Sequence, residues 1–94
     1  MEDKLYEAEF RQNGTETSVT YDLEGNRKEL ETEISTNKLP SAAIAYINKN
    51  YPKNKITTAS KIIDDKNTAT FEAEIKKGSK TQDVLFTEQG IFIR

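Results

Sequence analysis

A β-hairpin pattern that occurs twice places the strongest constraint on how this chain can fold. Residues 6–25 and 71–90 align without a gap, at an offset of 65 positions. The identical pairs are Glu7/Glu72, Ala8/Ala73, Glu9/Glu74, Val19/Val84 and Gly25/Gly90. Any two amphipathic hairpins share alternating apolar residues. Generic alternation does not explain the Glu-Ala-Glu that both segments share, or its equal spacing from the closing glycine. These two features favour a true internal repeat.

The N-terminal part of the chain shows the period-two alternation of strands that bury one face. Asn13-Gly14 predicts a tight hairpin turn, because both positions of a type I′ turn need a positive φ. Gly25 suits the turn that follows. The apolar sides of the three predicted strands are Tyr6, Ala8 and Phe10; Thr17, Val19 and Tyr21; and Leu30, Thr32 and Ile34. These strands form a meander.

One amphipathic helix is predicted after these strands. Pro40 suits a first helical turn, where its missing N–H costs nothing, and Pro52 ends the helix. At 100° per residue, one stripe collects the apolar side chains Leu39, Ala43, Ile44, Ile47 and Tyr51. The segment therefore packs one side on a core, while Tyr46 lies on its flank.

Four further strands are predicted after the helix. Their expected faces are Ile56, Thr58, Ser60 and Ile62; Phe71, Ala73 and Ile75; Val84 and Phe86; and Ile91 with Ile93. The fold class is therefore α+β. We expect an antiparallel meander of about seven strands, in the order βββ-α-ββββ, with the single helix packed on one face.

The repeat predicts one domain over residues 1–94, made of a partial repeat at 4–35 and a complete repeat at 38–94. One helix covers only two or three strands of such a sheet, because strands lie about 4.8 Å apart and a helix is about 10 Å wide. The apolar side of the first strands would then face water. Curling of the sheet, a second chain, or a helix preceding Met1 would each cover it.

Composition excludes several classes of function. The chain has neither His nor Cys, which removes the commonest general base, thiolate nucleophiles and most zinc sites. Its charge is −2, without a basic stripe for nucleic acid, and no apolar run is long enough to embed it in a membrane. Glu pairs on outer strand faces are ordinary solvated charge. We predict no catalytic residues, no metal and no cofactor.

Binding to a protein or peptide is harder to exclude. Three apolar residues, Leu5, Ile63 and Leu85, are predicted on outward-facing positions among charged neighbours. Scattered apolar surface residues are normal in soluble proteins. These three are nevertheless the candidate binding residues that the sequence offers.

The order of the motifs resembles a known family. The segments concerned are 6–10, 13–14, 19–22 with Gly25, and 31–34, followed by Leu39-Pro40, Tyr51-Pro52 and the second strand at 71–75. Together they resemble the PepSY-like, beta-lactamase-inhibitor-like proteins of Bacteroidetes. The resemblance implies an extracytoplasmic, periplasmic or secreted protein whose signal peptide has been removed, built from helix-plus-sheet repeats. It supplies no catalytic residues, and fold does not fix function.

Our leading hypothesis is a non-enzymatic extracytoplasmic binding or regulatory, inhibitor-like module with a protein or peptide partner. The alternative is a structural, self-associating module that forms a homodimer through its N-terminal strands. An enzyme ranks third.

Overall fold

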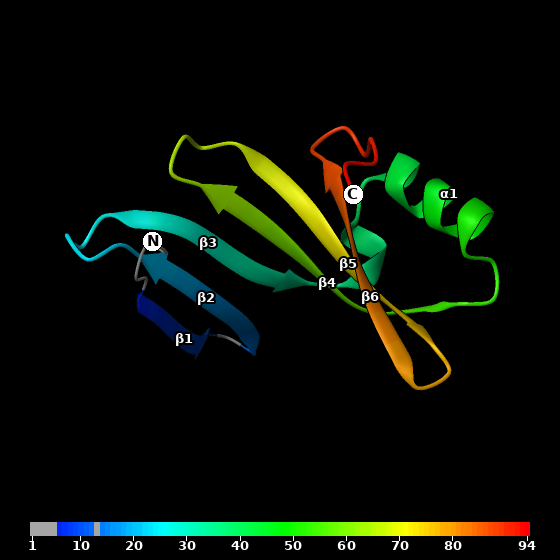
Figure 1. The fold of residues 1–94 in the computed structure, drawn as a ribbon, viewed down its shortest axis with the longest axis horizontal. Coiled ribbons are helices and arrows are strands. Elements are labelled where there is room, and N and C mark those ends of the chain that lie inside the picture. Colours follow the sequence, from blue (N-terminus) through cyan, green and yellow to red (C-terminus); the bar gives the residue numbers. More distant parts are fainter. Residues whose placement is uncertain (1–5, 13) are drawn as a thin grey trace.

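The computed structural model describes residues 6–12 and 14–94. Their elements follow one another as β1 (Tyr6–Gln12), β2 (Thr15–Tyr21), β3 (Arg27–Ile34), a 3₁₀ turn at Thr36–Lys38, α1 (Ser41–Asn50), β4 (Lys55–Asp64), β5 (Ala69–Lys77) and β6 (Lys80–Thr87). The strands form one antiparallel sheet in chain order. Figure 1 shows β1–β3 at one end of the long molecule and α1 with the C-terminus at the other. The α+β meander is confirmed, and the strand count is six.

The expected seventh strand is reduced to one bridge. Phe92 pairs with Phe86 in isolation, and the Ile93 N–H donates to the Leu85 carbonyl at 2.8 Å. The sequence pattern at Ile91 and Ile93 was therefore a correct sign of pairing with β6. The residues described after Gly90 form this single bridge with β6 and not the regular ladder that was expected.

The helix packs on one side of the sheet through small and branched side chains. Pro40 precedes the helix as its N-cap, and Leu39, Ala43 and Ile47 are buried, as the predicted stripe requires. The facing strands contribute the buried residues Ala59, Ala73, Ile75, Val84 and Phe86. We call this side of the sheet the helix side and the opposite side the open face. Ala43 on the helix and Ala59 and Ala73 on the sheet are all buried in this contact, so it is closed to solvent.

Two turns at equivalent positions of the proposed repeat have the same hydrogen bonds. After β2, the Asp22 N–H donates to the Asn26 carbonyl at 2.9 Å and the Gly25 N–H donates to the Asp22 carbonyl at 3.1 Å. After β6, the Thr87 N–H donates to the Ile91 carbonyl and the Gly90 N–H donates to the Thr87 carbonyl, each at 2.8 Å. Gly25 and Gly90 both have φ +86°. The duplication itself stays a prediction, but its two closing turns are built alike.

Strand β4 departs from the predicted alternation because its pairing with β5 shifts between Ile56 and Thr58. Both Ile56 and Ala59 pack against the core, whereas unbroken alternation would place them on opposite sides. The predicted face of Ile56, Thr58, Ser60 and Ile62 is therefore wrong beyond Ile56. Ile63 lies opposite Leu30 and Ala69 on the helix side, not on the outward side.

The helix side is only partly covered at the β1–β3 end. Tyr6 is 63% exposed and Phe10 is 47% exposed, while Val19 between them is buried. Neighbouring side chains bury Val19 but leave the two aromatic rings at the surface. The three covers expected from the sequence, a curled sheet, a second chain or a preceding helix, stay predictions. In the part of the chain that the structure describes, no helix has the length and apolar character needed to cross a membrane.

Candidate functional site: the open face of the sheet

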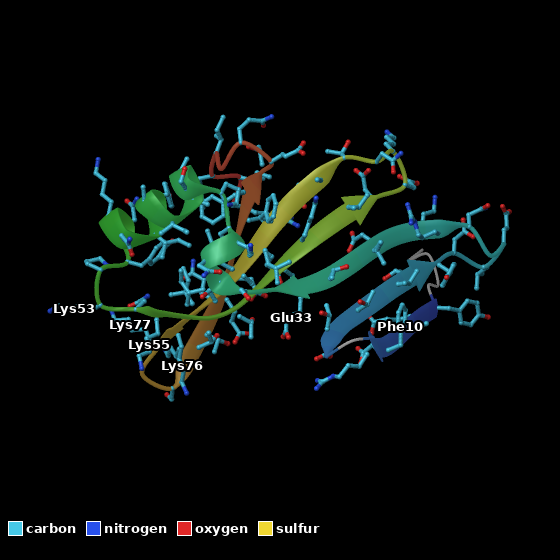
Figure 2. All side chains as sticks on the ribbon, turned by 180° about the vertical axis from the view of Figure 1, so that it is seen from behind. Phe10, Glu33, Lys53, Lys55, Lys76 and Lys77 are labelled. Atoms are coloured by element: carbon cyan, nitrogen blue, oxygen red, sulfur yellow. The ribbon has the colours of Figure 1, made fainter. Side chains whose placement is uncertain are left out.

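The open face gathers carboxylates from every strand. Strand pairing aligns them in rows across the sheet, so that Glu9 and Glu31 flank Ser18, and Glu33 and Glu72 flank Ser60. The acidic residues on this face are Glu7, Glu9, Glu16, Glu29, Glu31, Glu33, Asp64, Glu72, Glu74 and Asp83. In Figure 2, Glu33 lies near the middle of the molecule, between Phe10 and a group of lysines at the far end. The face is therefore predominantly negative, with Lys55 and Lys76 as a basic pair at its β4–β5 end.

Two pairs of carboxylates lie directly opposite each other on this face. Glu74 is opposite Asp83, and Glu29 is opposite Asp64. Opposed like charges on neighbouring strands destabilise a sheet. Among the described residues of β1 and β2, Arg11 lies 3.6 Å from Glu16 and offsets part of the negative charge.

Burial and neighbouring carboxylates raise the pKa of three carboxyl groups on this face. Partial burial, followed by the charges of Asp83 and Glu31, raises the pKa of Glu72 to about 7. Partial burial also raises the pKa of Glu31, although a hydrogen bond with Ser60 opposes the change. At the edge strand, a hydrogen bond with Glu7 and then its charge raise the pKa of Glu9. Glu72 is therefore the carboxyl group that is partly protonated near neutral pH.

An apolar island sits within the negative surface. Ile62, Leu85 and Ile93 line a hollow of about 400 Å³ whose charged lining is four carboxylates and one guanidinium, from Glu29, Glu31, Asp64, Glu72 and Arg94. Ile62 is 9% exposed, whereas Ile93 is 45% exposed. A second hollow of about 240 Å³ is lined by carboxylates of β1–β3, with Ser18 and Ser60. The face thus combines charge, a depression and an apolar contact.

The three predicted binding residues separate in the structure. Leu85 is half-buried in the apolar island, as an outward-facing position requires. Ile63 lies on the helix side, and Leu5 lies outside the described residues. The sequence did not predict Ile62 and Ile93 as residues of this site. Ile62 was expected on the helix side, but the irregularity in β4 places it on the open face. Ile93 was expected in a regular seventh strand. The only sequence signal for the island was the apolar Leu85 between Asp83 and Thr87.

The chemistry available on this face is that of carboxyl, hydroxyl and aliphatic groups. Among residues 6–12 and 14–94, no three carboxylates are arranged to hold a metal ion. A surface of this kind can bind a partner by charge and apolar contact. The fold and this face together define an α+β protein with one helix on an antiparallel meander and an open, acidic sheet face.

Comparison with known proteins places this fold in a family. The family described as "Putative beta-lactamase-inhibitor-like, PepSY-like" matches residues 4–94, so the chain belongs to it. This confirms the resemblance that the sequence motifs indicated. Among curated proteins, none matches the chain.

Solved structures from Bacteroides share the fold. A DUF2874 family protein from Bacteroides uniformis superposes with a TM-score of 0.85 at 21% identity, covering 100% of this chain and 72% of that one. A protein from Bacteroides eggerthii, described as putative periplasmic, gives 0.86 at 18% identity, covering 100% and 71%. A DUF2874 family protein from Bacteroides ovatus gives 0.82 at 18% identity, covering 99% and 69%.

Proposed function

We propose that this protein is a non-enzymatic, extracytoplasmic binding module whose open face docks a basic protein partner. The observation that carries the proposal is the coincidence of the apolar island with the crowded carboxylates around Glu72. The inhibitor-like family description and a structural neighbour described as periplasmic support the class and the compartment.

The energetics of the face favour a cationic occupant. A Lys or Arg placed between Glu31 and Glu72 would relieve repulsion that the isolated protein carries. It would also favour the charged form of Glu72, whose pKa is about 7 in the free protein. An apolar side chain of the partner would enter the hollow beside Leu85 and displace water from Ile62 and Ile93. Charge would speed and orient the encounter, and the apolar contact would hold it.

Three immobilised proteins test the proposal on extracytoplasmic extract of the source organism. They are the natural chain, the open-face variant E31K/E72K, and the control E24K/E88K, which makes the same charge change at exposed turn residues. We expect one protein to be retained by the natural chain and the control but not by the open-face variant. Equal retention by all three, or retention by none, contradicts the proposal.

A homodimer through the N-terminal strands is the second candidate function. It is favoured by the exposed rings of Tyr6 and Phe10 and by the position of β1 at the edge of the sheet. An unpaired edge strand beside apolar surface is a common route to self-association. Light scattering across micromolar concentrations decides it: a dimer that F10E converts to monomer supports it, and a monomer throughout excludes it.

A further inference from the structure

The molecule has a further concave surface, at the opposite end from β1. A cleft of about 530 Å³ lies between the turn that follows α1 and the β5–β6 hairpin. Tyr51, Pro52 and Ile75 supply its apolar lining, and Lys53, Lys77 and Lys80 supply its charge. Asn50, Asn54, Thr81 and Gln82 complete it with polar side chains. We call this site the lysine cleft.

The end of the sheet beside the cleft is densely cationic. Lys77 lies directly opposite Lys80 on the β5–β6 hairpin, and Lys55 lies directly opposite Lys76 on β4 and β5. Figure 2 shows Lys53, Lys55, Lys76 and Lys77 gathered together, far from Phe10. Two opposed lysine pairs cost stability, just as opposed carboxylates do. A negatively charged partner bound at this end of the sheet would relieve the repulsion within both lysine pairs.

The described part of the chain does not neutralise these lysines. Its ion pairs join Arg11 with Glu16 and Lys28 with Asp22 and Asp65, none of them at the cleft. The acidic residue of the neighbouring row, Glu74, belongs to the open face and accepts a hydrogen bond from the Thr57 hydroxyl at 2.7 Å. A cation near a helix C-terminus complements the helix dipole, which accounts for Lys49 in the last turn of α1. It does not account for Lys77 and Lys80, which come from the hairpin.

The wall of the cleft is held in place by backbone hydrogen bonds. The Tyr51 N–H donates to the Ile47 carbonyl at 2.8 Å, and the Asn54 N–H donates to the Tyr51 carbonyl at 3.1 Å. The Asn50 side chain is also fixed, because its amide donates to the Tyr46 carbonyl at 2.9 Å. Ile75 on the other side is 1% exposed and belongs to the core. The cleft is therefore built on ordered elements, which lowers the entropic cost of binding.

We propose that the lysine cleft binds an extended acidic peptide segment of a partner protein. Carboxylates of the segment would pair with Lys53, Lys77 and Lys80, while an apolar side chain would lie against Tyr51 and Ile75. The amide and hydroxyl groups of Asn54, Gln82 and Thr81 suit the N–H and C=O groups of an extended backbone. A duplex nucleic acid or a membrane is disfavoured, because the adjoining open face carries negative charge that repels a large polyanion.

A titration followed by amide NMR tests the proposal with defined probes. The first probe is a capped peptide of glutamates flanking one leucine, and the second has lysine in place of every glutamate. We expect only the acidic peptide to shift the amides of Tyr51, Asn54, Lys77 and Gln82, in a saturable way that added salt weakens. Shifts spread over the whole surface, or no shifts, overturn the proposal.

Matched variants separate the cleft from general charge. K77E/K80E should weaken binding about tenfold or more, because two attractive contacts become repulsive. K38E/K66E makes the same change at exposed lysines outside the cleft and should bind within about twofold of the natural chain. K77R/K80R keeps the charge and should retain binding. Equal losses in the two Glu variants overturn the assignment to the cleft.

Two further probes decide the class of partner. Vesicles of phosphatidylglycerol and a short DNA duplex present anionic surfaces without a peptide backbone. We expect neither to compete with the acidic peptide at physiological salt. Binding of vesicles or duplex in preference to the peptide overturns the proposal in favour of that partner. Because the cleft shares no lining residue with the two hollows of the open face, E31K/E72K is expected to leave peptide binding in place, so the two proposals fail independently.

Discussion

Tyr46 of α1 and Phe92 of the C-terminal segment stack face to face, with ring centroids 4.8 Å apart and an angle of 10° between the planes. Phe86 meets both rings edge-on, at 5.7 Å from Tyr46 and 6.3 Å from Phe92. The last residues therefore fasten the helix to β6. The sequence pattern predicted a regular seventh strand here, and the structure has this aromatic contact in its place.

Replacing Phe92 by alanine tests this fastening. F92A should lower the free energy of unfolding by about 1–2 kcal/mol, because it removes a ring stack in addition to buried area. F10A is the control, since Phe10 is also partly exposed but no ring of the described residues packs against it. It should cost about 0.5 kcal/mol or less. Urea denaturation measures both, and equal losses would contradict a specific role for the stack.

Gly90 and Gly25 form a natural matched pair. Both have φ +86°, so alanine at either site carries the same backbone strain of about 1–2 kcal/mol. At Gly90 a Cβ would also lie 2.9 Å from both the Ala42 Cβ and the Ala43 backbone nitrogen, whereas at Gly25 nothing lies within 4 Å. We therefore expect G90A to destabilise the protein by about 1–3 kcal/mol more than G25A. Thermal unfolding of the two variants checks this, and similar losses would show that the turn does not press on the helix.

Ala73 lies in the buried cluster that joins the helix to the sheet. It is fully buried opposite Ala59, under a helix whose own contact includes Ala43. A73L should cost about 1–3 kcal/mol through overpacking. A69L makes the same change on the same side of β5, at a half-buried site near the strand's start, and should cost less. If A73L is the milder of the two in chemical denaturation, the close packing described for α1 is wrong.

The raised pKa of Glu72 makes stability depend on pH. In the folded protein this carboxyl holds its proton to about pH 7, whereas in the unfolded chain it follows its ordinary value of 4.5. Between these values the folded state binds more protons, so stability falls as pH rises through this window. E72Q should flatten that dependence and stabilise the protein above pH 7. Melting curves at several pH values measure it, with E24Q, in an exposed turn, as the control. A natural chain whose melting temperature rises with pH over this window would contradict the assignment.

Much of the fold could be predicted because strand and helix patterns are local. A strand needs alternating apolar residues, and the chain supplies them at Tyr6, Ala8 and Phe10. A helix stripe needs apolar residues every three or four positions, and the chain supplies them at Leu39, Ala43 and Ile47. What failed depends on contacts between distant residues. The irregularity at Ile56 and Thr58 is set by pairing with β5, so alternation alone placed Ile63 on the wrong side. The apolar island joins β4, β6 and the C-terminal segment, and only Leu85 could be recognised from its neighbours. The lysine cleft had no sequence motif, because its lysines come from two segments.

Site-specific photo-cross-linking in cells that produce the protein tests the central claim most directly. A photoreactive amino acid would replace Leu85 on the open face, Phe10 on the exposed helix side, or Ala45, exposed on α1, in three separate strains. The account predicts a discrete adduct with a different, basic protein from position 85, and loss of that adduct when E31K/E72K is added. Adducts from position 45 or 10 with none from position 85 would contradict the account, and an adduct of twice the chain's mass from position 10 would establish the dimer instead.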